Sequence, residues 1–335
     1  MNLLHIASGE ANRDIFNPIF RSEIARFGEL RIVEDGSSLS GDERTALIRG
    51  CDVLLTGWGA APVSAAVASE PGTLRYVCHI TGEMRRTVPI EIIDAGIPVT
   101  NWGDTPASGV AEGAMALLLG AVKEIHLRVK HIERGGWGLD PATHGGTLEG
   151  LNVGIYGFGA IGRRFVDLLR PFGSTIRIFD PFAAGLPDDC LRVSSLEELF
   201  DTSEAIVIHA ALCDATAGSV TAGLLAKLPD HGVVVNTARG GIIDQDALFA
   251  ELESGRLRAG LDVLDPDSLP EDHPARGWEN LILTGHHIEN PWPLDGRPAT
   301  ALTPMQRVCV ENLRRFEAGE PLKFTMDRTR YLLST

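Results

Sequence analysis

Residues 151–180 read LNVGIYGFGAIGRRFVDLLRPFGSTIRIFD, and this stretch decides the fold. The apolar run at 152–156 predicts a short buried strand, and the run at 176–179 predicts a second strand that ends at Asp180. Between them, apolar residues recur on one face of a predicted helix: Phe165, Val166, Leu168 and Leu169. The order strand, helix, strand is that of a parallel βαβ unit.

Three glycines, Gly157, Gly159 and Gly162, form a G-x-G-x-x-G pattern between the first strand and the helix. The first allows a tight turn, the second lets a pyrophosphate approach bare backbone, and the third lets helix and strand pack closely. The helix N-terminus offers unpaired N–H groups to the phosphates. Asp180 is placed to accept hydrogen bonds from ribose hydroxyls and to repel a 2′-phosphate. The stretch therefore predicts a site for NAD rather than NADP. Its predicted contacts are Gly157, Phe158, Gly159, Ala160, Ile161, Gly162, Asp180 and Pro181.

The composition limits the class of protein. The chain has 335 residues, 44% of them hydrophobic and 22% charged, which predicts two globular domains. A net charge of −15 argues against partners such as nucleic acid or acidic membranes. The N-terminus has no basic segment before its first apolar run, so we expect no signal peptide. The five cysteines are scattered and show no zinc spacing, which predicts reduced thiols in a cytoplasmic protein and no metal site.

Before this stretch, short apolar runs alternate with helical patterns. Strands are predicted at 3–7, 30–33, 51–56, 74–80 and 97–101. Helices are predicted after Asp14, which could cap the first of them, and at 41–49, 63–69 and 88–95. Such alternation predicts a parallel sheet covered on both faces, so residues 1–101 form a small α/β domain.

One long helix is predicted from Ser108 to Lys130, apolar nearly all round at 114–122. Such a helix is buried, either between domains or in a subunit interface. The Gly-rich segment 133–147, with Trp137, is predicted to be an exposed arm. Together the helix and the arm predict a homodimer.

Further hallmarks lie along the chain in a fixed order: Val110-Ala111-Glu112, residues 148–162, residues 233–244 (VVVNTARGGIID), Leu261-Asp262-Val263 and residues 280–286. In this order they resemble the D-isomer-specific 2-hydroxyacid dehydrogenases, which include glyoxylate/hydroxypyruvate reductases and phosphoglycerate dehydrogenases. The resemblance covers nearly the whole chain. It implies two doubly wound parallel-sheet domains, Rossmann-like and flavodoxin-like, with the active site in the cleft between them. Residues 1–101 plus 303–335 would bind the substrate, and residues 102–302 would bind NAD.

Hydride transfer to a 2-oxo acid needs a cation for the carboxylate and a proton donor for the developing alkoxide. Arg239 ends a predicted strand at the carboxyl edge of the sheet, and its planar fork can hold a carboxylate. The resemblance makes it the catalytic arginine; the alternative is a structural ion pair. His286 is expected to donate the proton, since the family pattern Asn-x-x-x-Thr-Pro-His reads Asn280 to His286 without a gap, with Gly285 for Pro. His287 is the alternative.

The family pairs this histidine with a Glu before a Pro. Here Asp267 stands at that position and Ser268 replaces the Pro. A carboxylate beside an imidazolium favours the protonated ring, the form that can donate. Asp267 is one methylene shorter than Glu, so either its loop moves in or the pair is weaker; it could also be a solvated loop acid.

The resemblance also supplies further contacts. Asp262 would bind the nicotinamide carboxamide, unless it only caps a strand end, and Ala210, Thr237 and Ala238 would line the cofactor. Backbone N–H groups of Thr81, Gly82 and Glu83 would cradle the substrate carboxylate, although this turn departs from the family's commoner Gly-Ala-Gly-Val-Asp. Nearby cations, His79, Arg85 or Arg86, could favour a second anionic group on the substrate, or the arginines could simply be solvated.

These residues predict an NAD(H)-dependent oxidoreductase that interconverts a small 2-oxo acid and its D-2-hydroxy acid. Two alternatives use the same fold. Formate or phosphite dehydrogenases are one, but formate dehydrogenases carry Gln where Asp267 stands. The other is a corepressor-like protein that senses NAD(H) with little catalysis, which would explain the imperfect Glu site.

Overall fold

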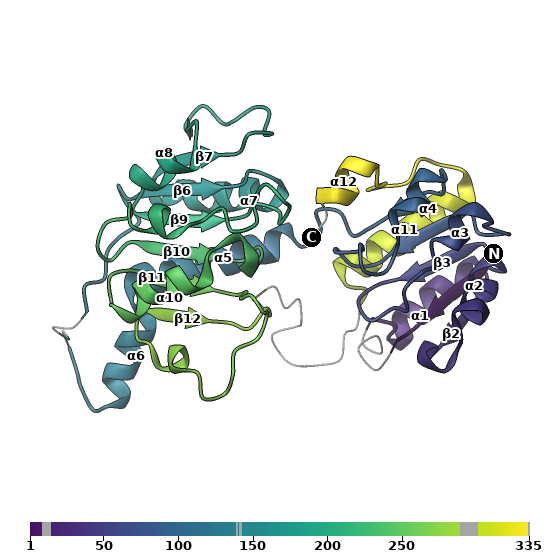
Figure 1. Cartoon of the computed structure of the whole chain (residues 1–335), viewed down its shortest axis with the longest axis horizontal. Helices are drawn as coiled ribbons and strands as arrows, with labels where there is room; N and C mark the ends of the chain where they lie inside the picture. The colour runs from purple at the N-terminus through teal and green to yellow at the C-terminus, as the bar shows by residue number, and fades with distance from the viewer. Residues whose placement is uncertain (9–14, 139, 141–142, 289–300, 334–335) are drawn as a thin grey trace. The chain divides into compact units, whose positions relative to one another are not determined.

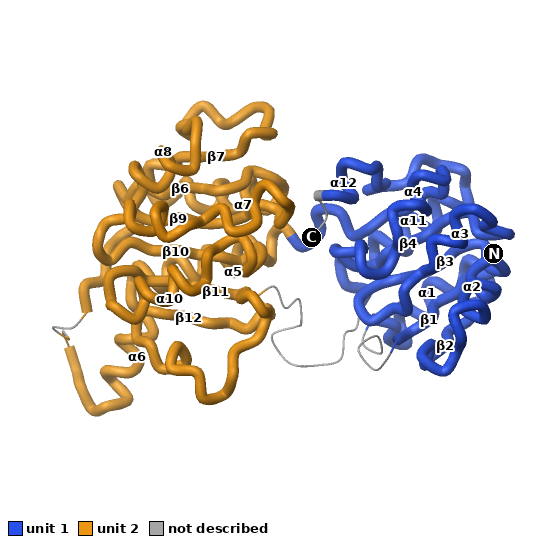
Figure 2. The backbone as a smooth tube through the Cα atoms, viewed as in Figure 1, with its two compact units in different colours: residues 1–106, 291–335 blue, residues 107–290 orange. Residues whose placement is uncertain are grey.

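The computed structural model describes residues 1–8, 15–138, 140, 143–288 and 301–333 (Figure 1). It divides into two compact units, Met1–Pro106 with Pro291–Thr335, and Ala107–Asn290 (Figure 2). The expected domain boundaries lie at 101/102 and 302/303. The first is a few residues before the observed boundary at 106/107, and the second is about a dozen residues after the one at 290/291.

The first unit is built on a five-stranded parallel sheet of order β2-β1-β3-β4-β5. Its strands are β1 (Asn2–Ile6), β2 (Glu29–Val33), β3 (Val53–Thr56), β4 (Tyr76–His79) and β5 (Val99–Thr100). Its α-helices are α1 (Pro18–Ile24), α2 (Gly41–Arg49), α3 (Ala66–Ser69), α4 (Ile90–Asp94), α11 (Pro304–Ala318) and α12 (Arg328–Leu333). The order 2-1-3-4-5 is that of flavodoxin-like folds.

The C-terminal helix α11 completes the first unit. Thr303 and Gln306 form its capping box, Pro304 is its first residue and Gly319 ends it in a left-handed conformation. Its buried Cys309 and Leu313 join the core around Phe20 and Tyr76. In Figure 1 this yellow helix lies among the purple and blue elements of the N-terminal sheet.

The first helix starts later than its apolar pattern indicates. Asn17 caps it by accepting the N–H of Phe20, and Pro18 is its first residue. Ile15 and Phe16 are buried in the turn before the helix rather than in it. The expected cap Asp14 lies outside the described residues.

The second unit carries a seven-stranded parallel sheet of order β12-β11-β10-β9-β6-β7-β8. Its strands are β6 (Asn152–Tyr156), β7 (Thr175–Phe179), β8 (Leu191–Arg192), β9 (Ala205–Ile208), β10 (Val233–Asn236), β11 (Arg258–Leu261) and β12 (Leu281–Leu283). Its α-helices are α5 (Ala107–Lys123), α6 (Ile125–Glu133), α7 (Ala160–Leu169), α8 (Leu196–Asp201), α9 (Ala222–Leu225) and α10 (Gln245–Glu253). Read from the other edge the order begins 3-2-1-4-5-6, the Rossmann order. The two predicted doubly wound domains are confirmed. The expected strands omit β8, since it is a two-residue, exposed edge strand.

The single helix predicted at 108–130 is wrong, because Glu124 interrupts it. This residue is left-handed (φ 50°) and separates α5 from α6. Its buried carboxylate pairs with Arg258 on β11 at 2.8 Å and accepts the N–H of His144 at 2.6 Å. These interactions offset the cost of the left-handed backbone. In the described part of the chain, no helix combines the length and hydrophobicity needed to cross a bilayer.

Helix α5 belongs to the core of its own unit. Ala114, Leu118 and Ala121 are buried with Phe165 of α7 and Val235 of β10. The apolar run at 114–122 is therefore buried by the core of its own unit. The homodimer predicted from this helix and the arm stays a prediction. Apolar exposure is found instead on α6 and the arm: Ile125, Val129, Ile132 and Trp137 are 51%, 51%, 49% and 89% exposed.

Candidate active site

The glycine loop after β6 is shaped as the pattern predicts. Gly157 has a φ of 96°, and a Cβ there would lie 2.5 Å from the backbone N of Ala210. A Cβ on Gly162 would lie 2.3 Å from the carbonyl oxygen of Gly157. Nothing lies within 4 Å of a Cβ on Gly159, where α7 begins without a side-chain cap. Two glycines thus permit close packing, while the third keeps the helix N-terminus open.

Asp180 directly follows β7, and its side chain reaches back to the glycine loop. Its Oδ2 accepts the N–H of Phe158 at 2.7 Å, and its Oδ1 accepts those of Phe182 and Ala183 at 2.8 and 3.0 Å. The carboxylate therefore also fixes the loop's shape. Arg192, which the sequence reasoning did not single out, donates to the carbonyls of Asp180 and Ala183.

Arg239 lies in a braced turn after β10. The side chain of Asn236 accepts the N–H of Ala238 at 3.0 Å and donates to the carbonyl of Arg239 at 2.9 Å. Nη1 of Arg239 donates to the carbonyl of Ala238 at 2.7 Å. Thr237 is buried. Asn236 was missed as a functional residue, although it stands within the quoted hallmark; its signal is an Asn at a strand end, where its amide can close a turn.

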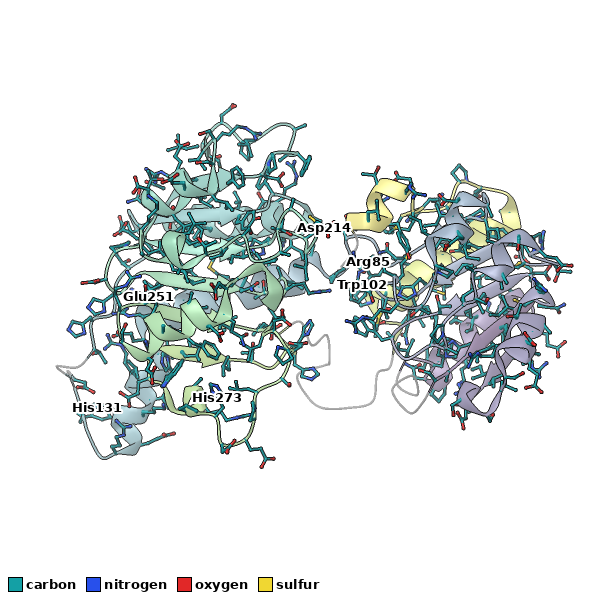
Figure 3. All side chains as sticks on the ribbon, in the orientation of Figure 1. Arg85, Trp102, His131, Asp214, Glu251 and His273 are labelled. Carbon is teal, nitrogen blue, oxygen red and sulfur yellow. The ribbon has the colours of Figure 1, made fainter. Side chains whose placement is uncertain are left out.

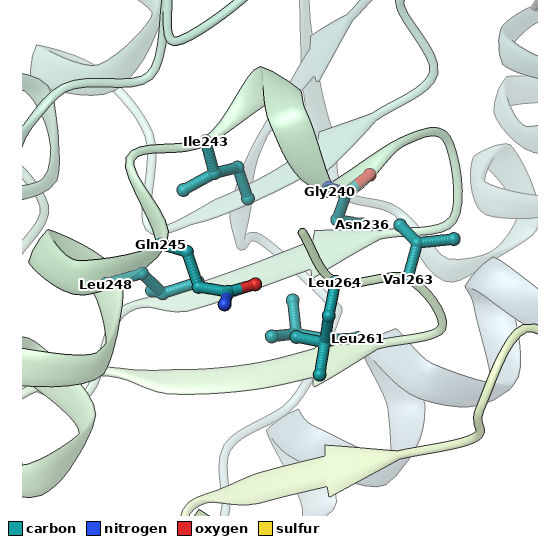
Figure 4. Close-up of a pocket in the computed structure, with 8 residues that line it drawn as sticks. All are labelled: Asn236, Gly240, Ile243, Gln245, Leu248, Leu261, Val263 and Leu264. Carbon is teal, nitrogen blue, oxygen red and sulfur yellow. The ribbon is translucent and has the colours of Figure 1, made fainter. Parts of the chain in front are cut away.

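The turn after β10 packs against the loop after β11. A Cβ on Gly240 would lie 2.1 Å from the carbonyl carbon of Leu264, so only glycine fits. The side chain of Gln245 accepts the N–H of Asp265 and donates to its carbonyl, at 2.9 and 3.0 Å. Figure 4 shows Asn236, Gly240, Gln245 and Leu264 around the small pocket where these segments meet. The segment that holds Arg239 is thus fixed to the one that leads to Asp267.

His286 and Asp267 meet after adjacent strands β12 and β11. Nδ1 of His286 lies 2.5 Å from Oδ2 of Asp267, and the two side chains are 46% and 50% exposed. An ionised carboxylate accepts this hydrogen bond, so Nδ1 carries the proton and Nε2 faces away from the pair. The structure brings together the predicted acid and His286, the ring selected by counting without a gap; His287 instead contributes its backbone N–H to Asp262.

Asp262 organises the histidine loop. Its Oδ1 accepts from the hydroxyl of Thr284 at 2.6 Å and from the N–H groups of His287 and Ile288 at 3.1 and 3.2 Å. Its carbonyl accepts the N–H of His286, which is left-handed with a φ of 62°. The side chain of Ile288 occupies the space over Gly113 of α5, where a Cβ would lie 2.3 Å from Ile288 Cγ1. Asp262 therefore caps the end of its strand, which is the alternative role expected for it; this role does not exclude binding of the nicotinamide carboxamide.

The turn after β4, in the other unit, holds Thr81, Gly82 and Glu83. Thr81 and Gly82 are buried. His79 is not a cation, because burial lowers its pKa to about 4. Arg85 lies 3.9 Å from the Glu83 carboxylate, and Arg86 is exposed. Of the three predicted cations, only the two arginines can face an anion at neutral pH.

Comparison with known proteins identifies the chain. Residues 115–287 match the family described as D-isomer specific 2-hydroxyacid dehydrogenase, NAD binding domain. The chain is 32% identical over 254 residues to hydroxypyruvate reductase of Thermotoga maritima, which covers 74% of this chain and 81% of that protein. The chain belongs to the D-isomer specific 2-hydroxyacid dehydrogenase family.

Other relatives agree with this family. Glyoxylate reductase of Korarchaeum cryptofilum is 27% identical over 89% of this chain and 90% of its own. The solved structure of a glyoxylate reductase from Paecilomyes thermophila superposes with a TM-score of 0.78 over 98% of this chain and 99% of that one, at 23% identity, which shows the fold. This dehydrogenase is an NAD-dependent oxidoreductase that interconverts 2-oxo acids and D-2-hydroxy acids.

The second unit of the dehydrogenase fits its dinucleotide cofactor. The open position at Gly159 and the uncapped N-terminus of α7 leave N–H groups available for phosphates. Among the described residues, no group of three or more His, Cys, Asp or Glu side chains is arranged to hold a metal ion.

Proposed function

We propose that Arg239, His286 and Asp267 carry the chemistry of this dehydrogenase. Bound NADH supplies the hydride. The guanidinium of Arg239 holds the carboxylate of the 2-oxo acid and polarises its carbonyl, as a planar fork with paired donors can. His286 gives the proton on Nε2 to the developing alkoxide, and Asp267 holds the ring through Nδ1. The 2.5 Å contact between His286 and Asp267 carries this proposal.

On the second unit, we propose that the loop from Gly157 to Gly162 holds the cofactor pyrophosphate and that Asp180 and Pro181 lie at the adenosine ribose. Ala210, Thr237, Ala238 and Asp262 would line the nicotinamide end. The openness at Gly159 and the position of Asp180 at the end of β7 support this assignment.

The first unit is proposed to bind the substrate. The backbone N–H groups of Thr81, Gly82 and Glu83 would receive the substrate carboxylate. The named relatives reduce hydroxypyruvate or glyoxylate, so we propose a small 2-oxo acid of this kind.

Turnover with a panel of 2-oxo acids tests the function. NADH oxidation is expected with glyoxylate or hydroxypyruvate, and Arg239→Lys should lower kcat/KM by about 100-fold, since lysine cannot reproduce the paired hydrogen bonds. Tight NADH binding without turnover of any oxo acid would instead support the NAD(H)-sensing alternative. NAD+ reduction with formate or phosphite, and with no hydroxy acid, would support the formate or phosphite dehydrogenase alternative.

We further propose a cytoplasmic homodimer, formed by α6 and the arm. Ile125, Val129 and Ile132 recur along one face of α6, and Trp137 follows in the arm. Half-exposed apolar side chains at this spacing favour burial against a second copy. Sedimentation should give a dimer for the wild type and a monomer for Val129→Glu, and a wild-type monomer at micromolar concentration would contradict the proposal.

A further inference from the structure

The side chain of His79 joins two segments of the first unit. It is the last residue of β4 and is 1% exposed. Its Nδ1 lies 2.9 Å from the hydroxyl of Thr56 on β3. Its Nε2 lies 2.8 Å from the carbonyl of Glu83 and 2.9 Å from the hydroxyl of Thr81. One buried ring therefore links β3 to the turn of residues 80–84.

The protonation state of this ring follows from its partners. The carbonyl of Glu83 can only accept, so Nε2 carries the proton and donates it. Nδ1 must then accept the hydroxyl proton of Thr56. A second proton on Nδ1 would remove that bond, and burial accordingly lowers the pKa of His79 to about 4. The imidazole is neutral and its tautomer is fixed.

The far side of the turn is held by Asn101 and Trp102. Nδ2 of Asn101 donates to the carbonyl of Gly82 at 3.2 Å, and the N–H of Trp102 donates to that of Thr81 at 3.4 Å. A Cβ on Gly82 would lie 2.5 Å from Cζ2 of the Trp102 ring, which is labelled in Figure 3. The ring of Trp58 packs edge-on against the ring of Trp102, with 5.1 Å between the two centroids.

The hydrogen bonds of the turn thus run through its carbonyls. Those of Thr81, Gly82 and Glu83 are engaged by Trp102, Asn101 and His79. The N–H groups of Gly82 and Glu83 have no hydrogen-bond partner within the described ranges. Backbone donors held in place by bonds to their neighbouring carbonyls need no reorganisation when an anion arrives.

We propose that His79 is a positioning residue for substrate binding: with Thr56, it fixes the turn of residues 80–84 so that its backbone N–H groups receive the substrate carboxylate. The inference rests on the proposed function of this turn. His79 itself lies behind the turn and does not touch the substrate. Its effect is expected on substrate affinity more than on the chemical step.

His5 provides a matched control. It is also 1% exposed, lies in the same sheet, and has its pKa lowered by burial to about 4. Its ring bonds to the carbonyl of Leu55 within β3 and stacks on Phe16, and neither contact involves the turn. If the mere removal of a buried histidine weakened substrate binding, the effect should therefore be the same at His5 and at His79.

The test compares His79→Phe, His79→Gln and Thr56→Val with His5→Phe in the full chain. Glyoxylate serves as substrate, oxalate as the carboxylate probe, and NADH affinity is measured separately. We expect His79→Phe to raise the KM for glyoxylate and the inhibition constant of oxalate at least about tenfold, with a smaller change in kcat and unchanged NADH affinity. The reason is that the hydrogen bonds of the ring to Thr56, Thr81 and Glu83 are lost and these groups are left without that partner. His79→Gln, whose amide can donate to Glu83, should recover part of this loss.

Thr56→Val keeps the shape of the core and should raise KM about threefold or more, because Nδ1 loses its donor. If His79→Phe fails to fold, the KM of Thr56→Val tests the inference in its place. The inference is overturned if KM and oxalate affinity stay within about twofold of wild type in Thr56→Val and His79→Gln, or if His5→Phe raises KM as much as His79→Phe. A wild type that binds neither oxalate nor any 2-oxo acid would overturn the proposed function, and this inference with it.

Discussion

The carboxylate of Asp262 accepts a 2.6 Å hydrogen bond from the hydroxyl of Thr284, across the ends of two neighbouring parallel strands. The same oxygen, Oδ1, also receives the N–H groups of His287 and Ile288. Three donors converge on one oxygen of a side chain that is 5% exposed. The residue expected to bind the nicotinamide carboxamide is therefore also the anchor of the proposed acid/base loop.

Substitutions at Asp262 should separate these two roles. Asp262→Asn retains an oxygen for the loop but loses the charge and a second acceptor, so we expect weaker NADH binding with the loop intact. Asp262→Ala removes the anchor as well and should lower kcat by a further factor of about 10–100, since three donors lose their partner. Stopped-flow titration with NADH and steady-state kinetics measure the two effects. Equal kcat in both variants would exclude the anchoring role.

Replacing each histidine in turn tests the proposed proton donor. His286→Asn should lower kcat by about 10²–10⁴-fold, the usual contribution of a general acid. His287→Asn is the matched control, because its backbone N–H to Asp262 is kept and turnover should change little. Asp267→Asn should fall between them, since the ring is still present but less well held. Full turnover in His286→Asn, with none in His287→Asn, would reverse the assignment.

The glycine loop was predictable because its function depends on local backbone conformation. Gly157 and Gly162 stand where any Cβ would meet backbone atoms, so the sequence itself carries the constraint. The pairing of His286 with Asp267 was expected from the family pattern, even with Asp for Glu. The shorter acid still reaches the ring, because its loop is held by Gly240 and Gln245.

Other features depend on contacts that spacing does not encode. The apolar run through residues 114–122 correctly predicts burial, but the break at Glu124 is set by Arg258, more than a hundred residues later. His79 looks like a cation in sequence, but burial in the folded protein lowers its pKa to about 4, and spacing does not encode that burial. Arg192, which donates to the carbonyl of Asp180, comes from a strand too short to give a periodic signal.

Removing the charge of Asp180 should relax the choice of cofactor. In Asp180→Ser we expect the ratio of kcat/KM for NADH over NADPH to fall by about 10–100-fold, because a carboxylate at the ribose repels a 2′-phosphate and Arg192 lies nearby. Asp180→Asn is the control for the structural role, as it can keep one bond to the N–H of Phe158 or Phe182. If both variants lose NADH affinity without any gain with NADPH, the carboxylate acts only on the loop.

Three histidines buried in the neutral state should make the protein sensitive to acid. Burial lowers the pKa of His5 and His79 to about 4 and that of His209 to about 3. In the unfolded chain a histidine titrates near its ordinary value of about 6.5, so below that pH the unfolded state binds protons that the folded state does not. The free energy of unfolding therefore keeps its whole contribution from these neutral histidines above about pH 6.5, and it falls as the pH drops toward 4.

At pH 5 this linkage amounts to roughly 2 kcal/mol for one histidine with a folded pKa near 4. Urea unfolding at pH 7 and pH 5 measures it. His5→Phe keeps the ring stacked on Phe16 and removes the titrating group, so its loss of stability between the two pH values should be about 2 kcal/mol smaller than that of wild type. An identical pH dependence in the two proteins would mean that His5 is protonated in the folded state, and that its contact with the carbonyl of Leu55 is the donor bond of a charged ring.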